Sequence, residues 1–491
     1  MASFFLESMD QTIVACALPS IASEFQSFSE SNWVPTAYML TVTAFLPIYG
    51  KVSDIAGRAA TMVFAILVFV VGSALCGAAR SMMWLIIARG LAGLGGGGIV
   101  ALSSVIITDL IPIERRAKYL SLLSVSMVVS YIIGPSLGGV LTDKVSWRWA
   151  FYINIPIGII AAAVIGFQLR TVPTQRLPGT WKTRLRRVDL LGTLLFVTTM
   201  VLLILALTWG GNQYHWRSAA VIAPLCFSAA LAVVFIIVEL RVASEPAIPI
   251  REFTRRNIAL LLSAHFLAGI PMFTFIYYMP MYFIVARHAT AANSGLYLLP
   301  ILVGIGVVSL VVSWAVTRLG IRRRMIAVAM AGLALGAGLA TLTKRETPMA
   351  QCVGILILPG ISLGIMFPVV TVGVQMVARR RNLTAITTLV PFAITFAATI
   401  GLSVMGTILT NGFQSRIAAV LDSGQAHDVD IRGILDDPSS VWGPSVSEAT
   451  RSAIIDAFVG ALRTIFYVNV GVSLAGLACA LGLKRFDPLG Y

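Results

Sequence analysis

Charged residues are scarce in this chain of 491 residues, because Asp, Glu, Lys and Arg together make up only 12 % of it. An ordinary soluble domain contains about 25 %, and a soluble chain of this length would need that charge to cover about three domains. Hydrophobic residues make up 58 %. The composition excludes a soluble, disordered or nucleic-acid-binding protein. It predicts a polytopic membrane protein whose net charge of +15 lies in loops beside anionic lipid.

Cysteine is also scarce, and the motifs of common enzymes are missing. The five cysteines lie in apolar stretches without the spacing of metal ligands, which predicts small buried side chains, no disulfide framework and no metal site. No Gly-x-x-x-x-Gly-Lys-Ser/Thr loop is present for ATP. Gly-x-Ser-x-Gly occurs at 134–138 and 360–364, but both copies fall inside apolar runs, where small residues favour helix packing, as in the glycine run 93–98. We therefore expect no enzyme activity and no cofactor.

About fourteen apolar runs are long enough to cross a bilayer, which takes about 20 residues. Basic residues collect in alternate loops, which predicts that these loops and both termini are cytoplasmic. No basic region precedes the first run, so we expect no cleavable signal peptide. The chain begins almost inside that run, and we expect the start of its helix to be missing from this sequence. The runs lie near 2–22, 33–50, 60–79, 83–108, 117–142, 149–169, 189–209, 218–240, 257–284, 291–316, 324–343, 350–376, 384–410 and 460–483.

The spacing of the runs predicts an all-α protein with two six-helix halves and an inserted helix pair. The stretch 50–58 after the second run is echoed weakly at 317–322 after the tenth, and duplicated halves are typical of transporters. The long polar segment 411–459 predicts a solvated loop on the non-cytoplasmic side. The predicted units are an N-terminal bundle at 1–170, a basic linker with two extra spans at 171–250, and a C-terminal bundle at 251–491.

Charged residues deep inside the apolar runs are the informative ones, because burying a charge there costs about 2.5–3.5 kcal/mol even on lenient scales. Asp10 lies mid-way along the first run, with Glu7 one turn earlier on the same face, and Arg89 lies in the fourth run. A carboxylate in an apolar cavity has a raised pKa and exchanges a proton near neutral pH, whereas a nearby arginine lowers that pKa. A pair that breaks and re-forms with conformation would be a proton switch. The alternative is a static structural ion pair.

Other polar side chains in the runs are weaker candidates for lining a substrate cavity. Tyrosine and glutamine offer polar tips on an otherwise apolar surface. A lone histidine in a helix can titrate, but more often it is simply hydrogen-bonded. These candidates are Tyr38, Tyr131, His265, Tyr277 and Gln375.

Five stretches, in this order, resemble signatures of the major facilitator superfamily, and specifically of its fourteen-helix drug:proton antiporter branch. The sequence departs from the usual motifs at Ala59, Ala92 and Ser130. The match covers essentially the whole chain. The stretches are 9–19 in the first run, 50–58 in the following cytoplasmic loop, 89–93 in the fourth run, 130–139 in the fifth run (the antiporter motif) and 147–158 at the start of the sixth.

The resemblance implies alternating access by rocking of two six-helix bundles around a central cavity. It implies proton coupling through Asp10, with Glu7 as a second acid and Arg89 in proton transfer, driven by the proton gradient. It also implies a latch in the loop motif and a fifth helix shaped by the antiporter motif. The latch residues are Gly50, Asp54, Gly57, Arg58 and Asp109, and the antiporter-motif residues are Gly134, Pro135, Gly138 and Gly139.

The sequence does not identify the substrate. The branch includes exporters of drugs and toxins and vacuolar importers of basic amino acids, and the acids of the first run suit cationic substrates of either kind. A facilitator-fold sensor that transports nothing is the third alternative. We expect a monomer in the lipid bilayer, in the plasma membrane for an exporter or in the vacuolar membrane for an importer, with a small molecule and protons as its partners and no nucleic acid.

Overall fold

The computed structural model describes residues 1–110, 113–168, 189–211, 214–241, 250–319, 323–377, 383–422, 438–443 and 446–484. Across these residues the structure is helical, apart from one isolated bridge between Gly210 and Tyr214. Twelve helical segments in this part of the chain are long and apolar enough to cross a membrane. The predicted all-α polytopic membrane protein is confirmed.

Two more long helices, α1 (Ala2–Phe25) and α3 (Trp33–Ala56), lie among these twelve segments but are less hydrophobic. Each has 24 residues, which corresponds to about 36 Å at a rise of about 1.5 Å per residue. Their hydropathy is lower because they carry polar side chains such as Glu7, Asp10 and Thr43, which are buried inside the protein. Fourteen spans were expected and twelve described segments are apolar enough. The remaining two, α1 and α3, are the helices with a polar interior face.

The first helix group, called the N-terminal group here, packs around α5. The glycine run of α5 allows this contact, because a Cβ on Gly93 would lie 2.3 Å from the Tyr38 carbonyl oxygen in α3. A Cβ on Gly95 would lie 2.5 Å from the Ala65 carbonyl oxygen in the next helix. The group consists of α1, α2 (Phe28–Ser31), α3, α4 (Arg58–Gly77), α5 (Met82–Leu110), α6 (Ile113–Lys144), α7 (Trp149–Tyr152) and α8 (Asn154–Gln168).

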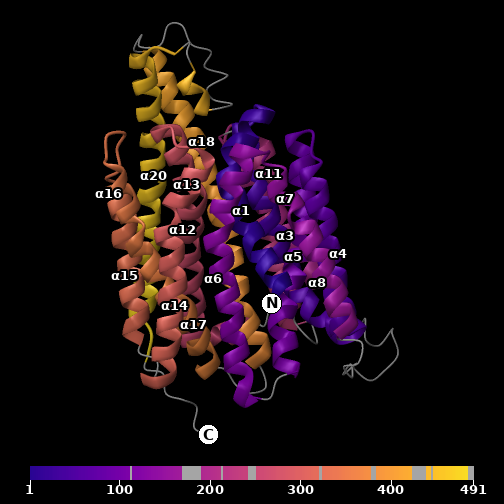
Figure 1. Ribbon diagram of the computed structural model, residues 1–491. Coiled ribbons are helices and arrows are strands. Elements are labelled where there is room, and N and C mark those ends of the chain that lie inside the picture. The colour runs from indigo at the N-terminus through magenta and orange to yellow at the C-terminus, as the bar shows by residue number, and fades with distance from the viewer. Residues whose placement is uncertain are drawn as a thin grey trace.

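The second group, called the C-terminal group, packs around α12 (Figure 1). The chain begins in the lower half of the molecule (Figure 1). The group consists of η2 (Ile250–Thr254), α12 (Arg256–Arg287), α13 (Ala291–Tyr297), α14 (Leu299–Leu319), α15 (Arg323–Ala340), α16 (Met349–Ile355), α17 (Ile357–Val377), α18 (Leu383–Asp422), η4 (Pro438–Trp442) and α20 (Glu448–Leu481).

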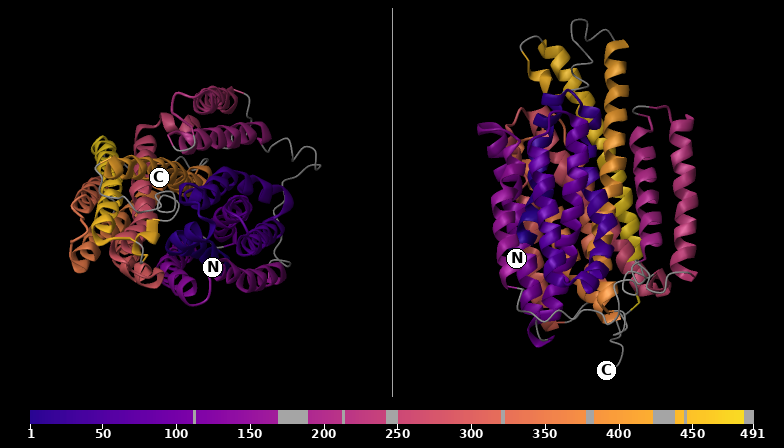
Figure 2. Two further views of the ribbon diagram at one scale, coloured as in Figure 1. Left: turned by 90° about the horizontal axis from the view of Figure 1, so that it is seen from above. Right: turned by 90° about the vertical axis from the view of Figure 1, so that its right-hand side faces the viewer.

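Two further helices, α10 (Leu190–Trp209) and α11 (Ala219–Arg241), form a pair outside both groups (Figure 2). α10 contacts α18 of the C-terminal group and α3 of the N-terminal group, whereas α11 packs mainly on α10. The Phe196 ring of α10 lies 5.6 Å from the Phe392 ring of α18, measured between centroids. The extra pair therefore covers the junction between α3 and α18.

The segment 411–459 is not a loop throughout, which corrects the sequence-based prediction. α18 continues to Asp422 and α20 begins at Glu448, so both ends of this segment are helical. These two helices project above the rest of the molecule (Figure 1). The two helices also contact each other, since the Phe413 and Phe458 rings meet edge to face at 5.4 Å. The apolar residues end at the expected membrane boundary, whereas the two paired helices continue beyond it.

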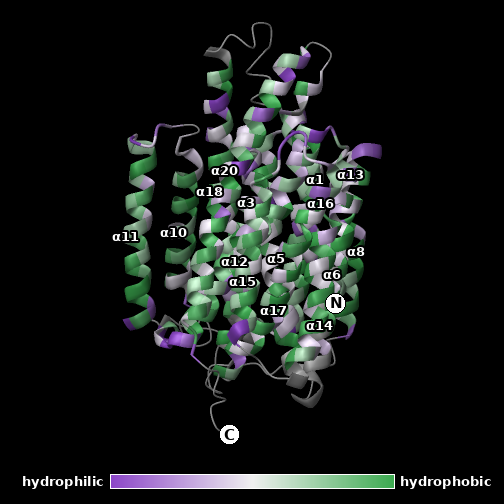
Figure 3. Ribbon diagram, turned by 90° about the vertical axis from the view of Figure 1, so that its left-hand side faces the viewer, coloured by the Kyte–Doolittle hydropathy of each residue, from purple (hydrophilic) through white to green (hydrophobic). Residues whose placement is uncertain are grey.

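Hydrophobic residues cover the flanks of the molecule, including α10 and α11, while hydrophilic residues gather at its two ends (Figure 3). Large apolar side chains such as Phe167 and Ile87 are exposed there, as expected for a surface that faces lipid. The five cysteines are free. Cys226 is exposed on α11 rather than buried as predicted, because that helix has an outward apolar face.

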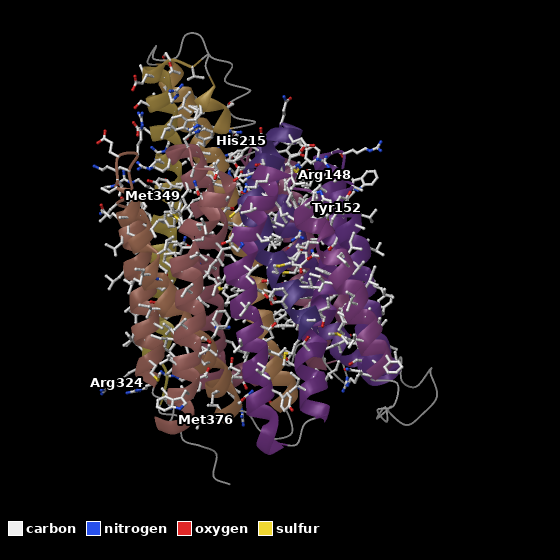
Figure 4. The ribbon with its side chains drawn as sticks, in the orientation of Figure 1. Arg148, Tyr152, His215, Arg324, Met349 and Met376 are labelled. Carbon is white, nitrogen blue, oxygen red and sulfur yellow. The ribbon has the colours of Figure 1, made fainter. Side chains whose placement is uncertain are left out.

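The upper end of the N-terminal group is held together by Arg148, which lies there next to Tyr152 (Figure 4). Its guanidinium binds Glu24 of α1 at 2.8 Å and the Ala79 carbonyl oxygen, which follows α4, at 3.1 Å. The Trp147 indole donates a second hydrogen bond to Glu24 at 2.5 Å. This contact fixes α1 beside α4 at the upper end of the molecule.

The two groups contact each other directly through several side chains. Thr43 of α3 and Thr399 of α18 are 3.3 Å apart between hydroxyl oxygens. The Tyr278 hydroxyl of α12 donates to the Asn32 side-chain oxygen over 3.3 Å. A Cβ on Gly406 of α18 would lie 2.5 Å from the Asn32 side chain. We call this boundary between the two groups the seam.

Candidate functional site

Asp10 and Arg89 form a fully buried ion pair inside the N-terminal group. Arg89 Nη1 lies 2.5 Å from Asp10 Oδ2, and both side chains are 0 % exposed. The Asn154 amide donates to the other oxygen, Asp10 Oδ1, over 2.9 Å. Helices α1, α5 and α8 therefore meet at one carboxylate with a partner on each oxygen. Removing one member of such a pair leaves an uncompensated charge in a low-dielectric environment.

The Arg89 guanidinium is enclosed by aromatic rings and retains one spare donor. It lies 4.0 Å above the Tyr38 ring centroid and 5.6 Å from that of Phe151. Gly96 allows the tyrosine to approach, because a Cβ there would lie 2.6 Å from the Tyr38 hydroxyl. Arg89 Nη2 has no hydrogen-bond partner among the described residues. Arg89 Nη2 is therefore available to bind a second acceptor.

Glu7 is buried beside this pair but is bound only by neutral donors. The Gln11 amide donates to Glu7 Oε1 over 2.5 Å, and the Tyr38 hydroxyl reaches the same oxygen over 3.4 Å. Glu7 is 1 % exposed, and it forms no ion pair within the part of the chain that the structure describes. An unpaired charge buried in this way is costly, so the site favours either a proton or a cationic ligand on Glu7.

Gln11 links these acids to the C-terminal group. The Tyr277 hydroxyl of α12 donates to the Gln11 carbonyl oxygen across the seam. The Tyr131 hydroxyl of α6 donates to the Gln11 side-chain oxygen over 3.4 Å. The predicted candidates Tyr38, Tyr131 and Tyr277 thus surround the acids of α1. A relative movement of the two helix groups must break the contact to Tyr277.

Two other predicted cavity residues lie away from this network. His265 of α12 is buried edge to face against Phe367 at 5.4 Å between centroids. Neither of its ring nitrogens has a hydrogen-bond partner among the residues that the structure describes, in contrast to the hydrogen-bonded histidine that is usual in a helix. Gln375 is half-buried two residues before the end of α17. Neither contacts the acids of α1.

Gln11 and Asn154 belong to the network, although the sequence analysis did not single them out. Both are polar residues within apolar runs, which is the signal that would have found them. Gln11 is also four residues from Glu7, the spacing at which side chains meet on one helix face. Asn154 is 144 residues from Asp10 in the sequence, and no spacing rule connects the two.

The predicted latch lies at the corner between α3 and α4. Arg58 Nη1 donates to the Gly50 carbonyl oxygen over 3.2 Å and also to the Ser53 hydroxyl. Gly57 has φ 100°, a conformation that a side chain disfavours. These contacts stabilise the corner within the N-terminal group. The other two predicted latch side chains, those of Asp54 and Asp109, lie outside the described part of the structure.

For the transport cycle that the resemblance implies, we expect Arg58→Ala to slow transport more than it weakens substrate binding. The variant loses charge-assisted hydrogen bonds at a corner that is not part of the α1 network, so maximal rate should fall about tenfold, or about 1.4 kcal/mol. Initial rates over a range of substrate concentrations measure the change. Arg58→Lys keeps the charge and serves as the control. A loss of affinity at normal maximal rate would contradict a role in the conformational step.

Part of the predicted antiporter motif packs α6 against α1. A Cβ on Gly134 would lie 2.2 Å from the Thr12 hydroxyl, and a Cβ on Gly138 would lie 2.3 Å from the Ile13 carbonyl oxygen. A backbone carbonyl cannot move away as a flexible side chain does. Gly138 therefore limits how closely α1 and α6 approach within the N-terminal group, while Gly134 leaves room for the Thr12 side chain.

The other two residues of the motif meet the C-terminal group. A Cβ on Gly139 would lie 2.3 Å from the Ala291 carbonyl oxygen of α13. A Cβ on Gly295 of α13 would lie 2.4 Å from the Pro135 carbonyl oxygen. The motif thus has one face inside its own group and one face at the seam.

Comparison with known proteins identifies the family. The sequence profile of the Major Facilitator Superfamily matches residues 1–402. This chain belongs to the major facilitator superfamily. As members of this superfamily are transporters, the chain is a membrane transporter of small molecules and not an enzyme, as predicted.

Curated relatives of this superfamily member are fungal proteins of similar length. The efflux pump roqT of Penicillium rubens is 31 % identical over 477 residues, 97 % of this chain and 87 % of the relative. The efflux pump aflT of Aspergillus parasiticus is 30 % identical over 483 residues, 98 % of this chain and 93 % of the relative. An MFS-type transporter of Claviceps purpurea is 32 % identical over 478 residues, 97 % of this chain and 82 % of the relative.

Solved structures of the superfamily share the fold at low sequence identity. A bacterial homologue of the human lysosomal transporter Spinster, inward-facing and unoccupied, has a TM-score of 0.65 at 15 % identity, with coverage of 98 % of this chain and 94 % of that one. The xylose transporter XylE from E. coli has a TM-score of 0.57 at 11 % identity, with coverage of 97 % and 94 %. These similarities confirm the fold.

Proposed function

We propose that this facilitator exports small organic compounds in exchange for protons by alternating access. The observation that carries this proposal is the buried α1 network, in which the Asp10–Arg89 ion pair lies next to Gln11, whose amide binds Glu7 and whose carbonyl oxygen accepts from Tyr277 of the opposite group. A carboxylate that is paired in one conformation and accessible in another can couple protonation to movement. The names of the fungal relatives, two of which are efflux pumps, support the direction.

The conformation fits one state of such a cycle. We place both termini in the cytoplasm and the upper end of the molecule outside, from the distribution of basic loops. The seam contacts through Asn32 and Gly139 then lie toward the outer end and hold it closed. Closure at this end corresponds to an inward-facing or occluded state.

We further infer that the protein is a monomer of the fourteen-helix antiporter branch, located in the plasma membrane. The twelve apolar segments, together with α1 and α3, supply fourteen long helices in the described part of the chain. The extra pair of α10 and α11 lies between the two groups in sequence and beside them in space (Figure 2). This arrangement supports assignment to the fourteen-helix branch.

Organic cations are the substrates that the site suits best. Glu7 offers a carboxylate without a cation of its own, and Tyr131 and Tyr277 add aromatic surface close to it, beside Gln11. Aromatic rings and an acid together bind a cation that has lost its water.

Uptake into proteoliposomes with a reversible pH gradient tests the proposed function. Lipophilic cations such as tetraphenylphosphonium should accumulate in an acidic lumen and stop accumulating when a proton ionophore collapses the gradient. Lysine, arginine and histidine in the same panel test for amino-acid transport. Accumulation that is unchanged without the gradient would contradict proton exchange.

We expect Glu7→Gln to weaken the binding of cationic substrates. The amide keeps the size and hydrogen bonds of the side chain but loses its charge. Losing one member of the buried charge pair between Glu7 and the substrate costs about 2 kcal/mol or more, which lowers the apparent affinity by a factor of about thirty. Transport rates over a range of tetraphenylphosphonium concentrations measure this change. Glu239→Gln removes a buried glutamate of α11 and is the matched control. Equal affinities for both variants would contradict a cation at Glu7.

A further inference from the structure

The first turn of α13 is capped by a carboxylate from the opposite helix group. The Ala291 N–H donates to Asp143 Oδ1 over 3.1 Å, and the Ala292 N–H donates to Oδ2 over 2.7 Å. Asp143 lies in the last turn of α6, in the N-terminal group. The next amide, that of Asn293, is bound by the Thr290 hydroxyl, a local cap. Because the first N–H groups of a helix have no partner inside it, α13 depends on both groups for its cap.

The chemistry of this contact favours a closed seam. A carboxylate at a helix N-terminus satisfies free N–H groups and interacts favourably with the positive end of the helix dipole. Within the described residues Asp143 forms no ion pair that would compete for it. Its two hydrogen bonds end on backbone atoms, so their length depends on the distance between α6 and α13. Separation of the groups at this end must break both.

The surrounding contacts show that the backbones meet here. Gly139, one turn before Asp143 on α6, faces the carbonyl oxygen of Ala291 without room for a Cβ. The buried Cys16 thiol of α1 lies beside the Ser294 hydroxyl of α13. The cap is therefore the outermost part of a continuous contact between α1, α6 and α13, and Cys16 lies underneath it.

We propose that Asp143 is a positioning residue of the transport cycle, whose carboxylate holds the outer end of the seam closed by capping α13. Each opening of that end exchanges the cap for water, and each closure restores it. This inference rests on the proposed alternating access and adds to it the residue that sets the balance between the two states at the outer end.

Labelling of Cys16 by a maleimide tests this role in the purified full-length protein, with the other four cysteines replaced by alanine. We expect Asp143→Ala to raise the labelling rate about tenfold, the change in open population that corresponds to loss of a cap worth about 1.4 kcal/mol. Asp143→Asn keeps one acceptor oxygen and should give an intermediate rate. Labelling of Asp143→Ala within about twofold of the parent would overturn the proposal, since surface changes alone have effects of that size.

Asp189→Ala is the matched control, because Asp189 caps α10 by accepting the Gly192 N–H over 2.7 Å without joining the two groups. Its labelling should equal that of the parent, and an equal rise in both variants would overturn the proposal as a general loss of stability. In transport assays Asp143→Ala should change maximal rate while apparent affinity stays constant. The labelling needs no gradient. If labelling changes as expected but the protein shows no gradient-driven transport, the proposed function is rejected while the role of the Asp143 cap is still supported.

Discussion

Asp10→Asn should abolish gradient-driven accumulation of substrate and also destabilise the protein. The substitution removes the carboxylate that we propose to exchange protons, and it leaves Arg89 buried without its counter-ion, since both side chains are 0 % exposed in the native pair. Breaking a buried pair from one side costs about 3–5 kcal/mol. Thermal unfolding in detergent and uptake into proteoliposomes measure the two effects separately.

The double variant Asp10→Asn with Arg89→Gln distinguishes coupling from stability. It removes both charges, and replacing a buried pair by neutral groups is often close to neutral in stability. We therefore expect the double variant to regain most of the lost stability while gradient-driven transport stays absent. The Tyr38 ring loses the cation above it in this variant, which accounts for a small residual loss.

Two outcomes would contradict this account. Transport by the double variant at the parent rate would show that the pair is a static structural feature. Full stability of Asp10→Asn alone would show that Arg89 finds another partner, for which its spare Nη2 donor is the available group. Exchange of substrate across the membrane without a gradient tells whether the variants still change conformation.

Much of this site could be predicted from the sequence, because charges inside apolar runs are rare and costly. Glu7, Asp10 and Arg89 were predicted on that basis, and the structure brings all three together. The sequence did not show how they divide: Asp10 pairs with Arg89, 79 residues away, while Glu7 contacts only neutral donors. That difference depends on which side of α1 faces α5, and hydropathy does not determine this.

The limits of the prediction have physical causes as well. Hydropathy marks where a chain leaves the bilayer, whereas a helix continues as long as its hydrogen bonds and packing allow. For this reason α18 and α20 extend into the segment 411–459. Likewise, the sequence identifies glycines as packing residues but not their partners, which for Gly138 and Gly139 lie in different helix groups.

These two adjacent glycines should respond differently to the same substitution. A Cβ on Gly138 meets the Ile13 carbonyl oxygen at 2.3 Å inside one group, whereas a Cβ on Gly139 meets Ala291 and Ala292 of the other group at 2.3 Å and 2.5 Å. Overpacking costs about 1–3 kcal/mol. Within a group that cost reduces the stability of the fold, but at the seam it is relieved when the two groups separate.

We therefore expect Gly138→Ala to lower thermal stability and Gly139→Ala to shift the conformational equilibrium. For Gly139→Ala the expected cost corresponds to a rise of about five- to 150-fold in the outward-open population. Cys16 labelling reports this rise. Transport should be lost while the melting temperature stays nearly unchanged. Gly138→Ala should melt at a lower temperature with labelling close to that of the parent. If the two variants lose stability equally and label equally, the seam does not open between α6 and α13, and the proposed role of this contact is wrong.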